Sequence, residues 1–170
     1  MVPRVMTPPI RGLPRESGAV RLELARADIG FSAAHFSVAG GVLERLHGHN
    51  YRVTLRARGD VGAEGTLVDF RALKAALRAE CALLDERMLV ATQSDSLSVE
   101  TSDAEVTVHG AGRRYVLPRD DVCLLPLRNT TCECLAAHLL QAVRHRLGEL
   151  PARLEVGVEE LPGQGAAVSE

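Results

Sequence analysis

Three histidines are spaced so that they could bind one metal ion together. His47 and His49 stand on either side of Gly48 in the stretch "LHGHNYRV", and His35 lies in the stretch "FSAAHF". Side chains two residues apart in a strand point to the same face, so His47 and His49 share a face if their stretch is a strand. Three neutral imidazoles with an open fourth position are the ligand set of a catalytic zinc ion, which binds water or substrate there.

The apolar faces of the two stretches support this interpretation. His47 and His49 are in phase with the apolar residues that follow them, and His35 is in phase with the apolar residues that precede it. If the two stretches pair as strands, the three imidazoles converge. For any one of them, the alternative is a core or turn histidine. The remaining histidines have no such context and are interpreted as surface or helix-packing residues: His109 in a turn, and His138 and His145 on a predicted helix.

Both stretches belong to longer segments with the alternation of half-buried strands. From residue 47 to 59, odd positions are mostly apolar and even positions mostly polar. From residue 20 to 35 the period is also two, but the apolar phase changes from even positions up to Leu24 to odd positions from Ala25 onward. One extra residue reverses the two faces of a strand, so we expect a β-bulge in this segment.

Two further segments have helical spacing. Asp69 is a candidate N-cap for a helix over residues 70–84, whose apolar residues recur every three or four positions. A second helix begins in "NTTCECLAAHLL", where Thr130 and Glu133 have the spacing of a capping box. Gly148 and Pro151 end that helix.

The remaining segments complete an α+β pattern. Residues 94–126 are less regular and include "AEVTVHGAGRRYVL", which predicts an extra hairpin that turns at residues 109–112. The last strand is "ARLEVGVEEL", with apolar residues on its even face. Two long strands, a helix, a hairpin, a helix and a strand predict two helices packed on one face of an antiparallel sheet.

Glu160 continues the apolar face of the last strand. A buried carboxylate needs a partner, and a ligand with two adjacent N–H donors would bind it through both oxygens. The alternative is that the strand has already ended and Glu160 is solvated. The sequence leaves both interpretations open.

Composition places limits on the class of protein. The chain has 170 residues, 46% of them hydrophobic, and a net charge of −2, which suits one globular domain and disfavours a binder of nucleic acid or of a membrane surface. We find no membrane span or signal peptide, and expect a cytoplasmic protein with reduced cysteines. Residues 1–18, with four prolines, are expected to form a flexible tail, and residues 19–170 a single domain.

Several of these stretches resemble one family. "FSAAHF", "LHGHNYRV", "GTLVDFRALK", "LLDERML", "NTTCECLA" and "VGVEEL" are similar, in this order, to motifs of the 6-pyruvoyl-tetrahydropterin synthase / 6-carboxytetrahydropterin synthase family. The resemblance covers about residues 25–161. It implies the tunnelling fold, in which a four-stranded antiparallel sheet carries two helices on one face. It also implies a homo-oligomer, usually two stacked trimers, with pterin sites between subunits.

The resemblance also implies roles for individual residues. His35, His47 and His49 match the zinc ligands, and Glu160 matches the glutamate that anchors the 2-amino group and ring N–H of the pterin. Thr131 and Glu133 match a motif at the helix start that lines the pterin pocket. For Glu133 this role and the capping box remain two alternatives that are compatible with each other.

This chain departs from the family at the catalytic positions. Leu43 stands where the family has a cysteine base, and "Leu84-Asp85-Glu86" keeps the aspartate but has Glu86 in place of a histidine. Glu44, three residues before His47, resembles the base of a branch with an E-x-x-H-G-H motif, which forms 6-hydroxymethyl-dihydropterin. The alternative for Glu44 is a solvated loop residue.

The expected function is therefore that of a zinc-dependent lyase. It would act on the side chain of 7,8-dihydroneopterin triphosphate or dihydroneopterin, with Glu44, Asp85 and Glu86 as the candidate acid and base groups. Burial that raises the pKa of Glu44 would suit it to this role. The alternative is a diverged zinc-containing protein that binds a pterin without synthase activity.

Overall fold

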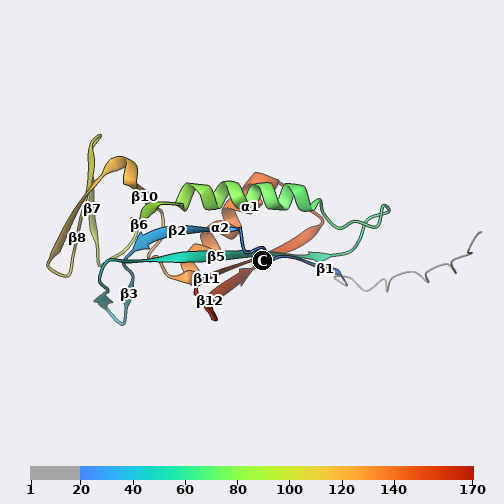
Figure 1. Cartoon of the computed structure of the whole chain (residues 1–170), viewed down its shortest axis with the longest axis horizontal. Coiled ribbons are helices and arrows are strands. Elements are labelled where there is room, and N and C mark those ends of the chain that lie inside the picture. Colours follow the sequence, from blue (N-terminus) through green and yellow to red (C-terminus); the bar gives the residue numbers. More distant parts are fainter. Residues whose placement is uncertain (1–19) are drawn as a thin grey trace, which may run out of the picture.

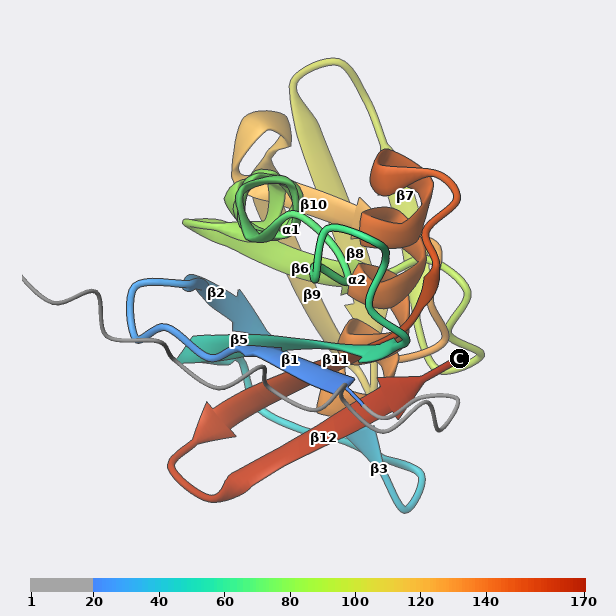
Figure 2. The same cartoon turned by 90° about the vertical axis from the view of Figure 1, so that its right-hand side faces the viewer.

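The computed structural model describes residues 20–170, and the tail predicted at residues 1–18 lies outside them. Its main sheet has the strand order β10-β6-β2-β5-β11-β12, and β1 pairs with the far end of β5. Both helices, α1 and α2, lie on one face of this sheet (Figures 1 and 2). The bounds in the main sheet are β1 Val20–Leu24, β2 Gly30–His35, β5 His47–Gly59, β6 Arg87–Ala91, β10 Val122–Leu125, β11 Ala152–Leu161 and β12 Gln164–Ser169.

The four-stranded antiparallel sheet is present as β2, β5, β11 and β12. Strand β12 has no counterpart in the sequence-based prediction, because its "QGAAVS" contains little apolar alternation. Strands β6 and β10 pair in parallel at the β2 edge and widen the sheet beyond the predicted four strands.

The long strand β5 is the centre of the sheet. Its odd positions from Tyr51 to Ala57 are buried under the helices, as the alternation predicts. The change of apolar phase within residues 20–35 is present, but the predicted β-bulge of one extra residue is wrong. Two separate strands, β1 and β2, pair with β5, and the residues between them include a turn in which the Ile29 N–H donates to the Arg26 carbonyl at 3.2 Å.

The helices begin and end close to the predicted residues. Helix α1 is Phe70–Leu84, and the Asp69 side chain accepts a hydrogen bond from the Arg71 N–H at 2.8 Å. Helix α2 is Cys132–Leu147 and ends at Gly148, whose φ of 68° is easily adopted by glycine. The apolar sides of both helices pack against the buried face of the main sheet.

A second, smaller apolar cluster lies at one end of the main sheet. There β7 Ser98–Thr101, β8 Glu105–Gly110 and β9 Arg113–Pro118 form a separate three-stranded sheet, followed by the short 3-10 helix η1 Arg119–Asp121. The predicted hairpin is β8–β9, and His109 lies at the end of β8, next to the turn. The short hairpin of β3 Val38–Ala39 and β4 Val42–Leu43 lies at the same end (Figure 1).

Within residues 20–170, neither helix is long and apolar enough to cross a membrane.

Candidate metal centre

The end of β2 and the start of β5 bring the three histidines together. His35 is paired with His47, and the neighbouring Ala33 is paired with His49, so all three rings project to the helix-covered side of the sheet. One ligand nitrogen from each ring lies within 4.8 Å of the others. The predicted pairing of the two strands is therefore present, and it provides three convergent imidazoles.

Two of the rings are oriented by main-chain carbonyls. The Nδ1 atom of His35 lies 3.1 Å from the Thr130 carbonyl, and Nδ1 of His47 lies 2.7 Å from the Arg45 carbonyl. A carbonyl can only accept, so each Nδ1 donates its proton to the carbonyl, which leaves the lone pair of a neutral ring on Nε2. Metal-binding histidines are commonly held in this way.

The Nε2 atom of His35 fits a role as a metal ligand. It is buried and has no hydrogen-bond partner, which would be costly if nothing bound there. Burial, followed by the nearby His47, lowers the pKa of His35 and favours the neutral ring. An unpartnered lone pair on a neutral ring fits a metal ion, so these residues are suited to hold one.

Glu44 lies beside this centre, in the connection between β4 and β5. Its carboxylate accepts a hydrogen bond from the Ser37 hydroxyl, and its N–H donates to the Ser37 carbonyl at 2.9 Å. The Ser37 hydroxyl is the largest cause that lowers the pKa of Glu44, and it outweighs the effect of burial. Burial does act to raise this pKa, but the net shift is downward, so the raised pKa considered from the sequence is not present and Glu44 is an ionised carboxylate at neutral pH.

Glu160 lies at the end of β11, close to the histidines. Its Oε2 is 3.9 Å from Nε2 of His49, its Oε1 accepts from the Gln164 amide at 2.5 Å, and its side chain is only 18% exposed. Glu160 is thus enclosed beside the centre and is not a solvated residue beyond the end of the strand. Burial, followed by the neighbouring Glu160, raises the pKa of the Cys132 thiol to about 11 and favours its protonated form.

The start of helix α2 contributes the remaining predicted residues. Thr131 occupies the N-cap position without a side-chain hydrogen bond to the helix, so the predicted capping box is not formed. The Thr130 hydroxyl instead donates to the Phe36 carbonyl at 3.1 Å and lies 3.2 Å from Nδ1 of His35. The residue predicted to cap the helix therefore supports a histidine of the centre.

One cavity of about 370 Å³ collects most of the predicted site. It is lined by all three histidines, by the candidate base and by the predicted pterin-binding residues: His35, His47, His49, Glu44, Thr131, Glu133 and Glu160. A cavity of this size, with a few polar groups directed into it, can enclose a small molecule.

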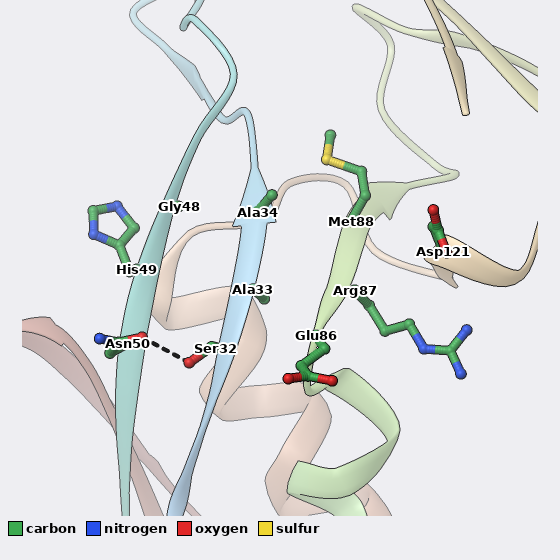
Figure 3. Close-up of a pocket in the computed structure, with 10 residues that line it drawn as sticks. All are labelled: Ser32, Ala33, Ala34, Gly48, His49, Asn50, Glu86, Arg87, Met88 and Asp121. Atoms are coloured by element: carbon green, nitrogen blue, oxygen red, sulfur yellow. Dashed lines mark hydrogen bonds between the residues drawn. The ribbon is translucent and has the colours of Figure 1, made fainter. Parts of the chain in front are cut away.

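Asp85 and Glu86 are not part of this cavity. Asp85 follows α1 and accepts a hydrogen bond from the Ser32 N–H at 2.7 Å, and Glu86 adopts a φ of 54°, which is unusual for a residue other than glycine. Glu86 lies beside β6, whereas the His49 ring projects from the far side of β5, with β2 between them (Figure 3). Within one chain these two acids are therefore separated from Glu44.

Sequence reasoning did not identify Ser37, Cys132 or Gln164, which also line the cavity. Ser37 contacts Glu44 only because the β3–β4 hairpin folds back, and Gln164 reaches Glu160 only through the turn before the unpredicted β12. The position of Cys132 between Thr131 and Glu133 was the one available signal.

Curated and structural comparisons agree on one family. The sequence profile described as 6-pyruvoyl tetrahydropterin synthase matches residues 25–170. A protein of Methanocaldococcus jannaschii named "Putative 6-carboxy-5,6,7,8-tetrahydropterin synthase" is 29% identical over 145 residues, covering 82% of this chain and 89% of that protein. A Pyrococcus horikoshii protein of the same name is 28% identical, covering 74% of this chain and 75% of its own length.

Solved structures give the same result for the fold. The 6-pyruvoyl tetrahydropterin synthase of Plasmodium vivax superposes with a TM-score of 0.84 and 28% identity, covering 89% of this chain and 97% of that chain. Two further structures of that enzyme, each 27% identical, carry alanine or cysteine in place of a glutamate described as a catalytic residue. Together with the α+β architecture, these matches confirm the expected tunnelling fold. This chain belongs to the 6-pyruvoyl tetrahydropterin synthase family.

Proposed function

We propose that this protein is a zinc-dependent lyase that shortens the side chain of 7,8-dihydroneopterin triphosphate or dihydroneopterin, with 6-hydroxymethyl-dihydropterin as the expected product. The observation that carries the proposal is the single cavity in which the Glu44 carboxylate, three histidines and Glu160 meet. The family supplies the pterin class of substrate. The catalytic glutamate of the Plasmodium vivax enzyme supports Glu44 as the base.

Each group has a distinct task in this proposal. Zinc held by His35, His47 and His49 would stabilise negative charge that develops on a side-chain oxygen. Glu160 would hold the pterin ring, because a carboxylate can accept from the 2-amino group and the ring N–H at once. Thr131 and Glu133 line the same cavity and would contact the bound pterin.

Glu44 would move the proton. As an ionised carboxylate it would accept the proton of the 2′ hydroxyl group of the side chain. The bond between C1′ and C2′ then breaks, its electron pair moves to C1′ and into the pterin ring, and C2′ leaves as an aldehyde. Return of the proton from Glu44 to C1′ completes the hydroxymethyl group.

Asp85 and Glu86 would act from a neighbouring copy of the chain. They lie outside the cavity of their own chain, so any role in proton transfer requires that a second chain present them there. We therefore propose a homo-oligomer, a hexamer of two trimers, with sites between subunits.

Mixing Glu44→Gln chains with Asp85→Asn chains should restore activity that neither variant has alone. Two inactive variants that stay inactive when mixed would contradict a shared site.

The deciding experiment is incubation of zinc-loaded protein with dihydroneopterin triphosphate and with dihydroneopterin, followed by liquid chromatography and mass spectrometry of the pterins. A hydroxymethyl product would support the proposal. A carboxy or pyruvoyl product would keep the lyase class but assign the protein to another branch of the family.

The second candidate function is a pterin-binding protein without synthase activity, because Leu43 and Glu86 replace the family's cysteine and histidine. Tight binding with unaltered substrate would favour it.

A further inference from the structure

The extra hairpin β8–β9 reaches the chain segment that carries Glu44. The guanidinium of Arg113, at the start of β9, donates from Nη1 to the Glu44 carbonyl at 2.8 Å and from Nη2 to the Leu43 carbonyl. The hairpin and the β3–β4 hairpin lie at the same end of the molecule (Figure 1). One side chain thus joins two segments about 70 residues apart in the sequence.

The same short segment is held on its other sides as well. The next carbonyl, that of Arg45, accepts from Nδ1 of His47 at 2.7 Å, and the Glu44 N–H donates to the Ser37 carbonyl at 2.9 Å. Three successive carbonyls, at positions 43 to 45, are therefore all hydrogen-bonded. Arg113 supplies the contacts of two of them.

Arg113 is itself held by contacts that connect it, through Tyr115 and Phe36, to the segment of the candidate metal ligand His35. Its Nη1 lies 3.3 Å from the hydroxyl of Tyr115, whose ring stacks on Phe36 with the ring centroids 5.1 Å apart. Phe36 directly follows His35 in the chain. The hairpin also closes over Leu43, because a Cβ added to Gly110 would lie 2.8 Å from its Cδ2 atom.

We propose that Arg113 is a positioning residue that holds the Leu43–Glu44 main chain so that the Glu44 carboxylate faces the histidines. This role rests on the proposed function of Glu44 as the base. Arg113 does not line the cavity that contains the histidines, so it acts through the main chain of Glu44. A planar guanidinium suits the task, because its two parallel N–H groups can bind two neighbouring carbonyls, whereas a lysine offers one flexible ammonium group.

Arg113→Ala is the direct test, with Arg114→Ala as the matched control. Arg114 is the next residue of β9, is exposed, and has its side chain on the opposite face of the hairpin. We expect Arg113→Ala to lower kcat by about 10- to 100-fold, because a misplacement of about 1 Å can cost 10²-fold. KM and bound zinc should stay within about threefold of the wild-type values. Arg114→Ala should match the wild-type protein in all three.

Arg113→Lys covers the case in which the alanine variant fails to fold. It keeps the charge and the long stem but loses the paired donors, so kcat should fall between that of the wild type and that expected for alanine. The positioning role would be overturned if Arg113→Lys and Arg113→Ala both had the same kcat as the control Arg114→Ala.

Hydrogen exchange separates this inference from the proposed function. The amide of Glu44 is bonded to the Ser37 carbonyl, so loss of the Arg113 contacts should speed exchange in residues 42–46 in Arg113→Ala but not in Arg114→Ala. If the wild-type protein forms no product, the proposed function fails, and the exchange comparison decides alone whether Arg113 holds this segment. Equal exchange in both variants would overturn the inference whatever the activity.

Discussion

The Ser37 hydroxyl donates a hydrogen bond to Oε2 of Glu44, and the main chains of the same two residues are joined at 2.9 Å. This double contact crosses from the residues after β2 to those before β5, and it fixes both the place and the charge of the candidate base. Because the hydroxyl lowers the pKa of Glu44, the carboxylate is ready to accept a proton at neutral pH.

Glu44→Gln should retain zinc and pterin binding but lower turnover at least about 10²-fold, the usual contribution of general acid–base catalysis. The amide has nearly the same shape but cannot accept the proton. Steady-state product formation and calorimetric pterin binding would measure the two effects. Glu100→Gln, on β7, is the control, because Glu100 is exposed and does not line the cavity. Turnover equal to that of the control would exclude Glu44 as the base.

Ser37→Ala tests the hydroxyl group that donates a hydrogen bond to the Glu44 carboxylate. Without the hydroxyl the carboxylate loses its fixed orientation, so we expect a turnover loss of about tenfold, smaller than that of Glu44→Gln. The double variant should be no worse than Glu44→Gln alone, since the hydroxyl acts through the carboxylate. Additive losses in this double-mutant cycle would show that Ser37 contributes independently.

Removal of the metal should destabilise the folded protein. A ligand present at about 100 times its dissociation constant adds about 2.7 kcal/mol, which for a chain of this size corresponds to roughly 5–10 °C in Tm. We therefore expect chelation to lower Tm by that amount and zinc to restore it. His49→Ala should lose both bound zinc and the Tm response, and His145→Ala, exposed on α2, should lose neither. A Tm unaffected by chelator and zinc would contradict a metal site at these histidines.

A comparison of variants at Glu159 and Glu160, at the end of β11, distinguishes a loss of pterin binding from a general effect of removing one charge. Glu160 lines the cavity, whereas Glu159 lies on the opposite face of the strand. Loss of a charged hydrogen-bond acceptor costs about 1.5–3 kcal/mol, so Glu160→Gln should raise the pterin Kd or KM by about 10- to 100-fold. Glu159→Gln should leave it unchanged. Similar values for the two variants would remove Glu160 from the pterin site.

Sequence reasoning succeeded where local pattern determines structure. Asp69 and the apolar spacing after it predicted helix α1 correctly, and the period-two pattern of residues 47–59 placed His47 and His49 on the same side of β5. These features depend on contacts along the chain or between adjacent strands.

Sequence reasoning failed where contacts join distant segments. The contact of Arg113 with Glu44 spans 69 residues, and no local pattern indicates it. The separation of Asp85 from the cavity depends on how α1 returns to the edge of β2, where Asp85 accepts the Ser32 N–H. Strand β12 was missed because its residues are mostly small, and it is held at the edge by pairing with β11.

The C-terminal segment provides a prediction of pH-dependent stability. The Glu170 carboxylate accepts hydrogen bonds from Nε of Arg144 at 2.6 Å and from the Leu154 N–H at 3.1 Å. The Arg144 guanidinium has the largest effect and lowers the pKa of Glu170 below its ordinary value of 4.5. Burial raises this pKa, and the Leu154 N–H lowers it further, so the net shift is downward. The ionised form is thus favoured by folding.

A lowered carboxyl pKa adds stability above the unfolded-state value, and this stability is lost as the pH falls through the folded-state value. Because both side chains are about 30% exposed, the contribution should be about 1 kcal/mol at neutral pH. We expect Glu170→Gln to unfold at a Tm about 2–4 °C lower than wild type at pH 7, with the difference vanishing below the folded-state pKa. Thermal melts in chelator from pH 7 to pH 3 would measure it, with exposed Glu149→Gln as the control. A difference that persists unchanged at pH 3 would mean that the charge of Glu170 is not its source.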